Sequence, residues 1–112
     1  MTIEEKKKYL STYRLKQTKI NRLGELMVTY PESREEYKAR LQDIVDERDT
    51  MEKEMAEVLD PLLSEILVLK YQCGKTIEEI SYSINYSRRH TERLFLKALG
   101  EFKAKNENLI LN

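Results

Sequence analysis

The chain has 112 residues, of which 40% are hydrophobic and 36% are charged, with three glycines and two prolines. This composition is typical of long, solvated helices, and the length allows one compact domain or a small domain with an extension. The formal net charge is zero, which argues against a histone-like protein that binds nucleic acid through its overall charge.

The cysteine content and the chain start bear on location. Cys73 is the only cysteine, so an intrachain disulfide is impossible and a reducing cytoplasm is expected. We expect this cysteine to be a small buried residue at a helix end. The first residues lack the apolar segment of a secretory signal, and no apolar run approaches the ~18 residues that a membrane span needs. The sequence therefore predicts a cytoplasmic protein with no membrane partner.

The first segment predicts a long helix. Thr2 and Glu5 have the spacing of a capping box, and the helix continues to about Tyr30 because Pro31 prevents it from going further. An apolar stripe with steps of three and four residues indicates which side is buried. This stripe consists of Tyr9, Tyr13, Ile20, Leu23, Met27 and Tyr30.

The second segment predicts another helix, from about Glu35 to Leu59, with Ser33 as its expected cap. It carries a heptad seam with one polar break at Arg48. We interpret its methionines and tyrosine as helix-packing surface rather than as ligands. The apolar members of the seam are Tyr37, Leu41, Ile44, Met51, Met55, Val58 and Leu62.

Charge relates these two helices to each other. Residues 2–22 contain seven basic and two acidic residues, whereas residues 32–60 contain five basic and eleven acidic residues, giving net charges of +5 and −6. Opposite signs favour an antiparallel hairpin, although each exposed pair contributes at most ~1 kcal/mol. An intertwined dimer would bury the same stripes, so both arrangements remain open. We interpret residues 6–8, three lysines, as a solvated helix start or as partners of the acidic helix rather than as a nucleic-acid contact.

A third helix begins at Asp60 and Pro61, which have the residue types of an N-cap and a first helical position. It is apolar on nearly all sides, and Gly74 is expected to end it. The unit from Pro61 to Phe102 has only about 40 residues, and units of that size rarely remain folded on their own core. We therefore expect the N-terminal hairpin, a second subunit, or both to complete it.

Residues 76–102 predict two short helices joined by a tight turn. Thr76 and Glu79 form a second capping box, Asn85 tolerates a left-handed backbone, and Ser87 is suited to cap the second helix. Ser81 is the small residue expected where the helices cross. A short helix, a tight turn and a helix that begins with basic residues predict a helix-turn-helix that enters a DNA groove. The apolar residues expected between the helices are Ile77, Ile80, Ile84, Tyr86 and Leu94.

Several runs in this half of the chain match a known family: residues 63–71 (LSEILVLKY), 74–76 (GKT), 78–80 (EEI), 86–88 (YSR) and 97–99 (KAL). They resemble region 4 of sigma-70-type factors. They resemble more closely small prophage-encoded proteins of Gram-positive hosts, which are grouped with phage late-gene regulators of the ArpU and RinA type. The resemblance covers residues 61–103 and implies a DNA-binding regulator whose helix after Ser87 reads the major groove. The chain departs from sigma factors at Arg89, Thr91, Glu92 and the apolar pair Phe95-Leu96.

The second helix of the motif supplies the expected DNA contacts. Its N-terminal N–H groups favour phosphate, and arginine side chains match guanine O6 and N7. The expected base-contacting residues are Arg88, Arg89, Glu92 and Arg93, with Glu92 accepting from a cytosine amine or orienting a neighbouring arginine. The expected phosphate-contacting residues are Lys75, Thr76, Ser87, His90 and Lys97. His90 fits either role, or that of an ordinary surface histidine.

Together these patterns predict an all-α protein with three parts. Residues 1–60 form a helical hairpin or coiled-coil extension, residues 61–103 form a three-helix sigma-region-4-like helix-turn-helix domain, and residues 104–112 form a tail. In the tail, Leu109, Ile110 and Leu111 either dock on a neighbour or fray. The expected function is a sequence-specific DNA-binding transcriptional regulator of phage or prophage type. Its expected partners are double-stranded DNA, a second copy in a homodimer, and RNA polymerase.

Other functions are compatible with parts of this pattern. A phage DNA-packaging protein of the small-terminase type would bind DNA as a larger ring, whereas a protein-interaction module would contact RNA polymerase without binding DNA. An enzyme is not expected, because the chain has one histidine, one cysteine, no glycine-rich phosphate loop and no metal-ligand spacing. We expect no cofactor and no metal. The sequence leaves open whether dimerisation uses the extension or the Phe95-Leu96 surface.

Overall fold

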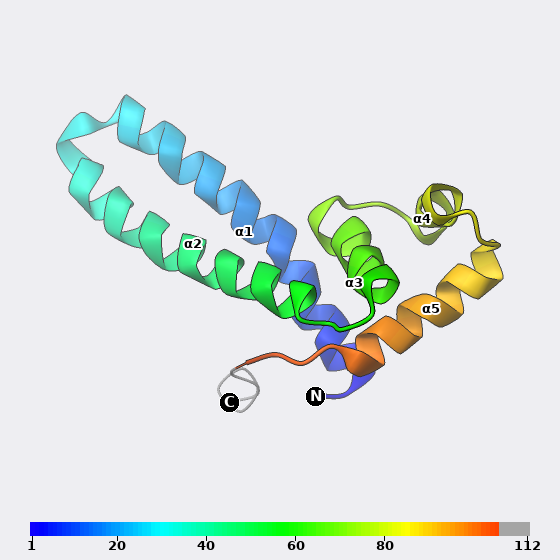
Figure 1. The fold of residues 1–112 in the computed structure, drawn as a ribbon. Coiled ribbons are helices and arrows are strands. Elements are labelled where there is room, and N and C mark those ends of the chain that lie inside the picture. Colours follow the sequence, from blue (N-terminus) through cyan, green and yellow to red (C-terminus); the bar gives the residue numbers. More distant parts are fainter. Residues whose placement is uncertain (106–112) are drawn as a thin grey trace.

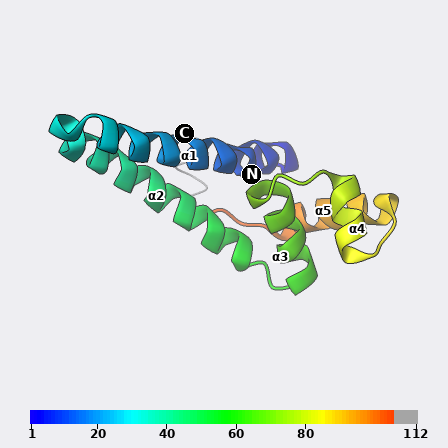
Figure 2. The same cartoon turned by 90° about the horizontal axis from the view of Figure 1, so that it is seen from above.

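The computed structural model describes residues 1–105, which form helices and no strand. The predicted all-α class is confirmed. Figures 1 and 2 show a long two-helix hairpin, α1 and α2, that projects from a group formed by α3, α4 and α5. Leu109, Ile110 and Leu111 lie outside the described residues. The elements are α1 (Ile3–Thr29), the short helix η1 (Pro31–Ser33), α2 (Arg34–Ala56), α3 (Pro61–Leu67), the π-helical turn η2 (Val68–Gln72), α4 (Ile77–Ile84) and α5 (Arg88–Glu101).

Helices α1 and α2 pack against each other within the chain. Polar contacts between them add to the apolar stripes: Lys16 Nζ lies 3.9 Å from a Glu47 carboxylate oxygen, and Arg48 Nη1 donates to Gln17 Oε1 at 3.2 Å. Of the two arrangements that the sequence left open, this chain has the antiparallel hairpin.

The predicted caps of the hairpin have different outcomes. The capping box at the start of α1 is present, since Glu5 N donates to Thr2 Oγ1 and Thr2 N donates to Glu5 Oε1. The expected cap at Ser33 is wrong, because its side chain makes no capping bond. Ser33 belongs to η1 and has φ −104° and ψ 11°, whereas an N-cap side chain needs an extended backbone to reach the helix N–H groups.

The hydrophobic core lies where the base of the hairpin meets α3, η2 and α5. Leu10 of α1 and Met55 of α2 are fully buried in it together with Leu67 of α3 and Leu99 of α5. The hairpin therefore completes the C-terminal unit, as its small size required. The other buried core residues are Tyr13, Met51, Val58, Leu63, Ile66, Tyr71, Ile80, Phe95, Ala98, Phe102 and Ala104.

Polar contacts fix the two parts to each other. Lys6 Nζ donates to the Leu99 carbonyl at 2.8 Å and to the Gly100 carbonyl at 3.3 Å, so this lysine binds the last turn of α5. The interpretation of Lys6 as a solvated residue or a partner of α2 is therefore wrong. Buried Glu54 accepts the Tyr9 hydroxyl at 2.5 Å and the backbone N–H of Lys105. Burial and this carboxylate raise the pKa of Tyr9, so its phenol remains a donor.

The end of the third helix differs from expectation in one respect. Gly74 ends it with φ +69°, as predicted, because glycine adopts this left-handed conformation without a side-chain clash. The guanidinium of Arg14 in α1 lies directly over this glycine, where an added Cβ would be 1.3 Å from Arg14 Nη1. The prediction of a buried Cys73 is wrong: its thiol is free and the residue is exposed after η2.

Candidate nucleic-acid interface

The turn between α4 and α5 sets the direction of α5. Asn85 has the left-handed conformation, with φ 60° and ψ 38°, and its N–H and that of Tyr86 both donate to the Ser81 carbonyl. Ser87 then caps α5 by accepting the His90 N–H at 3.1 Å. Three residues therefore join the two helices, and each local bond that the sequence predicted here is present.

Replacing Asn85 by alanine is expected to lower the free energy of unfolding by roughly 1 kcal/mol, because a Cβ in the left-handed region approaches the following carbonyl oxygen and asparagine, whose polar side chain can hydrogen-bond locally, adopts this conformation more readily than alanine. The measurement is a urea titration followed by helical circular dichroism. Glycine at the same position is the matched control and should leave the stability nearly unchanged. Equal losses in both variants would show that the left-handed turn is not the source of the effect.

One side of α5 packs on the core. Phe95, Ala98 and Leu99 are buried there, and Phe95 contacts the Tyr71 ring at a centroid distance of 6.1 Å. Thr91 is fully buried, and its hydroxyl donates to the Ser87 carbonyl at 2.8 Å. This bond satisfies the buried hydroxyl at a position where sigma factors usually have an aliphatic side chain. Of the apolar pair at 95 and 96, only Leu96 is exposed.

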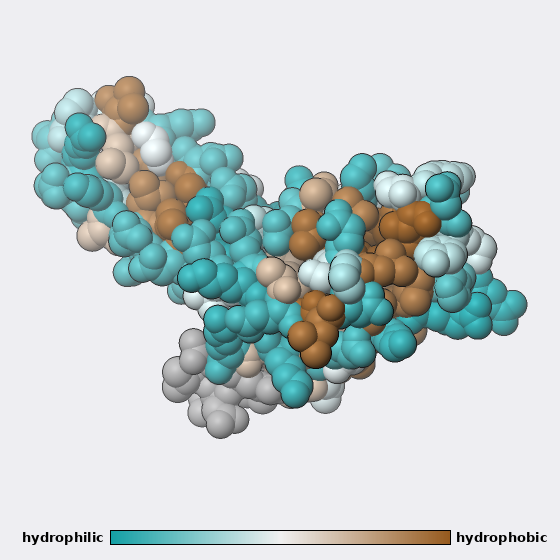
Figure 3. All heavy atoms as spheres, in the orientation of Figure 1, coloured by the Kyte–Doolittle hydropathy of each residue, from teal (hydrophilic) through white to brown (hydrophobic). Residues whose placement is uncertain are grey.

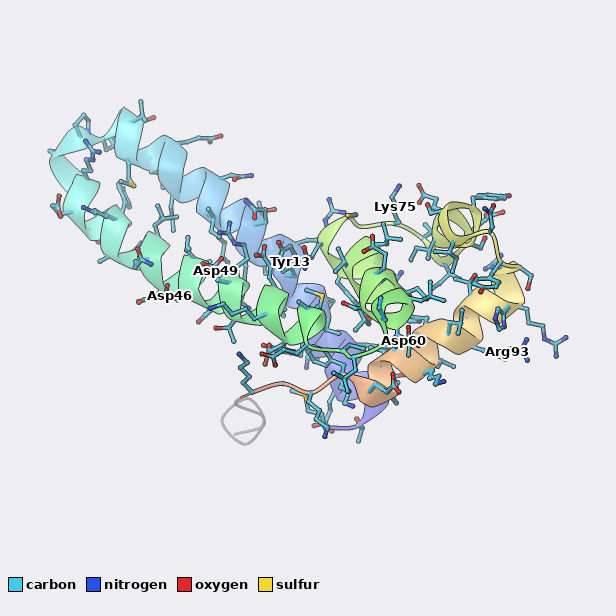
Figure 4. The ribbon with its side chains drawn as sticks, viewed as in Figure 1. Tyr13, Asp46, Asp49, Asp60, Lys75 and Arg93 are labelled. Carbon is cyan, nitrogen blue, oxygen red and sulfur yellow. The ribbon has the colours of Figure 1, made fainter. Side chains whose placement is uncertain are left out.

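The exposed surface of α5 carries the predicted base-contacting residues. All of them are exposed, together with Lys97. Arg89, Arg93 and Lys97 lie opposite the buried side of the helix, whereas Arg88 and Glu92 lie one turn apart beside the buried side, near the helix start. Figure 4 shows the Arg93 side chain pointing away from the body of the protein. The structure therefore brings these residues onto one accessible surface, called the α5 face below: Arg88, Arg89, Glu92, Arg93 and Lys97.

Two contacts organise charges on the α5 face. Arg88 Nε lies 3.7 Å from a Glu92 carboxylate oxygen, and both side chains are more than half exposed. Arg93 Nη2 lies 3.4 Å from His90 Nδ1. In the free protein Glu92 is thus placed to orient Arg88, and His90 is placed beside Arg93. Arg89 and Lys97 extend from the same face without an ion pair to any residue among 1–105.

The remaining predicted phosphate contacts are separate from this face or already bonded. Lys75 points out of the loop before α4, apart from Arg93 in Figure 4. Thr76 Oγ1 accepts the Glu79 N–H at 3.2 Å, and Thr76 hydrogen bonds lower the pKa of the Glu79 carboxyl. Glu78 is also exposed in this first turn, so two acidic residues surround Thr76. Ser87 uses its oxygen as a cap, which leaves its hydroxyl proton free to donate.

Two exposed tyrosines precede α5, one in the turn before it and one on α4. Tyr86 was expected among the apolar contacts, but it is 46% exposed and packs edge-on against the His90 ring at a centroid distance of 4.8 Å. Tyr82 is 74% exposed on α4, and sequence reasoning did not single it out. Its position outside the apolar stripe of residues 77, 80 and 84 could have indicated that this tyrosine is exposed.

Other site types have less support in the described chain. A groove of about 700 Å³ lies between α1 and α2, lined among others by Tyr9, Met51 and Glu54, but no residue of α4 or α5 contributes to it. Residues 1–105 contain no group of three or more histidine, cysteine or acidic residues placed to hold a metal ion. No helix in this range combines the length and apolar character needed to cross a membrane.

Comparison with known proteins found no matching family model, no matching curated protein and no matching solved structure. The resemblance to sigma-factor region 4 and to phage late-gene regulators therefore stays a prediction from the sequence.

Proposed function

We propose that this protein is a sequence-specific DNA-binding transcriptional regulator of phage or prophage type, in which α4 and α5 form a sigma-region-4-like helix-turn-helix. In this proposal α5 enters the major groove, the protein acts as a homodimer in the cytoplasm, and RNA polymerase is a further partner. The proposal rests on the α5 face together with the resemblance in residues 61–103.

The observation that carries the proposal is the combination of a capped helix start with an exposed basic side. Helix α5 has 14 residues and is about 21 Å long, and the ~10–12 Å diameter of an α-helix fits a major groove ~12 Å wide. Four of the five residues on the α5 face are basic, although the whole chain has no net charge. Basic residues concentrated on the exposed surface of one helix favour a defined contact with DNA over non-specific attraction.

The positions on α5 suggest a division of roles. Arg89 and Arg93 lie one turn apart near the helix start, where side chains reach base edges in a helix-turn-helix. Arg88 with Glu92 forms a charged pair that can present a guanidinium in a fixed direction. Lys97, two turns along the helix, is better placed for phosphate. The acidic surroundings of Thr76 make a phosphate contact there less favourable.

The test of the proposal is a binding selection from short random duplexes at two salt concentrations. Selective binding that weakens steeply with salt is expected, because neutralised phosphates release counterions. The protein is used as the full chain, and sequencing of the bound pool gives the site. Absence of binding at low salt would overturn the proposal and favour a protein-interaction module.

Lys97→Ala is expected to weaken binding to all DNA sequences alike and to lower the slope of log K against log salt by about one, because one phosphate contact is lost. The measurement is a titration of a selected and a scrambled duplex at several salt concentrations. Lys103→Ala is the control, since Lys103 is exposed beyond the end of α5. A change in sequence preference with Lys97→Ala would assign this residue to the bases instead.

A further inference from the structure

The projecting part of the hairpin has no core of its own. Between Tyr13 and Met51 no residue belongs to the hydrophobic core, and Leu23 is the single buried residue in that stretch of the described chain. Val28 is 82% exposed. Figure 3 shows apolar residues on the surface of this projecting part. The half-buried apolar residues there are Ile20, Leu26, Met27, Tyr37, Leu41, Ile44 and Val45.

One side of α2 has an ordered sequence of charges. Along one edge of the seam that faces α1, and sharing Leu41 with it, six residues follow one another at steps of three or four, so they lie along one helix side. In chain order they are two basic, two apolar and two acidic residues. These residues are Arg34, Lys38, Leu41, Val45, Asp49 and Glu52.

The neighbouring side of α1 is uncharged. The hydrogen bonds from Tyr13 to Glu52 at 2.5 Å and from Arg48 to Gln17 place Tyr13 and Gln17 on the same side of the hairpin as the ordered stripe. Burial and the Glu52 contact raise the pKa of Tyr13 to about 12, so this phenol keeps its proton. From Gln17 toward the tip, the same side of α1 continues through Ile20, Gly24 and Val28.

We propose that this side of the hairpin, the hairpin face, binds a second copy of the chain, with the two hairpins antiparallel about a two-fold axis near the middle of α2. The order basic, apolar, acidic is complementary to the same stripe of a second copy only when the two α2 helices run antiparallel. The rotation places Arg34 opposite Glu52 of the second copy and Lys38 opposite Asp49 of the second copy. It also places Leu41 against Val45 of the second copy, so one interface repeats the same contacts twice.

Two unpaired basic residues, two accessible acidic residues and open space support this occupant. Arg34 and Lys38 are exposed and form no ion pair with residues 1–105. Asp49 and Glu52 contact Arg48 of the same chain at 3.0 Å and 3.9 Å, and their side chains remain 45% and 41% exposed. A Cβ added at Gly24 would meet no atom within 4 Å, so neighbouring side chains can approach the backbone of α1 closely. A parallel arrangement would place like charges opposite each other and is disfavoured.

This inference rests on the homodimer in the proposed function and names its surface. The test is sedimentation equilibrium of the full chain without DNA, so its outcome is independent of DNA binding. The expected mass is twice 13.4 kDa. Lys38→Glu alone and Asp49→Lys alone are each expected to raise the dimer dissociation constant about tenfold or more, because two ion pairs between the copies become two repulsions. Asp49→Lys also removes the contact of Asp49 with Arg48 in its own chain, which Lys38→Glu leaves in place. An equimolar mixture of the two variants is expected to form a heterodimer near the wild-type affinity.

Matched controls separate this interface from general charge effects. Lys19→Glu and Asp43→Lys make the same charge changes at exposed positions outside the hairpin face and should leave the dimer constant unchanged. Circular dichroism confirms that all variants keep their helices, and Val45→Glu provides a further variant expected to lose the dimer. A monomeric wild-type chain, or single variants as dimeric as wild type, would overturn the inference. A monomer that binds DNA selectively would overturn the interface while leaving DNA readout intact.

Discussion

Leu10→Ala is expected to lower the free energy of unfolding by about 2–5 kcal/mol, the range for removing a fully buried leucine from a core. Leu10 lies on α1, yet its cluster includes α3 and α5, so the cavity would open between the hairpin and the part that carries the α5 face. We therefore expect DNA binding to be lost together with helix content in a single transition. The measurement is a urea titration followed by circular dichroism and by fluorescence of a labelled duplex.

Leu15→Ala is the matched control, because it makes the same change five residues along α1 at a side chain that is 55% exposed. Its expected effect is within about 0.5 kcal/mol. If Leu10→Ala unfolded the hairpin while DNA binding persisted to higher urea concentrations, residues 61–105 would have a stable core of their own. The physical unit would then be the C-terminal part rather than the whole described chain.

Local features of the fold were predictable because their partners lie within a few residues. The capping boxes at Thr2 and Thr76, the Asp60 cap and the left-handed Asn85 each depend on bonds inside one or two helical turns. The predicted Ser33 cap is absent, and the reason is also local. Pro31 starts η1 and takes the following residues out of the extended conformation that a capping side chain needs.

Contacts that join distant parts of the chain were not predictable from periodicity. Lys6 binds the Leu99 carbonyl across 93 residues, and Glu54 binds the Lys105 N–H across 51 residues. In the sequence, Lys6 belongs to a run of lysines and Glu54 to an acidic helix, so neither stands out. Their partners are backbone groups, which every residue type carries, and no side-chain pattern marks them.

The α5 face was predictable because a helix with one buried side must expose the other. Residues 91, 95, 98 and 99 fix the buried side, and Arg89 and Arg93 follow on the opposite side from the helical period. Tyr86 lies in the turn, where no period applies, and this explains why its exposure was missed. The helical period predicts which residues are exposed, but it carries no information about which bases they contact.

Arg89→Ala is expected to relax the sequence preference of binding at one base pair, at a cost of ~1–3 kcal/mol for the preferred sequence. Its guanidinium is exposed one turn before Arg93 and forms no ion pair among residues 1–105, so its loss leaves no buried partner unsatisfied. The fold should therefore be unaffected. The measurement compares binding of the selected duplex with single-base variants at one salt concentration.

Arg40→Ala is the control for Arg89→Ala, because it removes an exposed arginine from α2, far from the α5 face in the chain. It should change neither the affinity nor the preference. Arg89→Lys distinguishes base readout from charge, since lysine keeps the charge but lacks the planar fork that matches guanine O6 and N7. If lysine restored the full preference, Arg89 would act through its charge on phosphate, and the base-reading role would pass to Arg88 and Arg93.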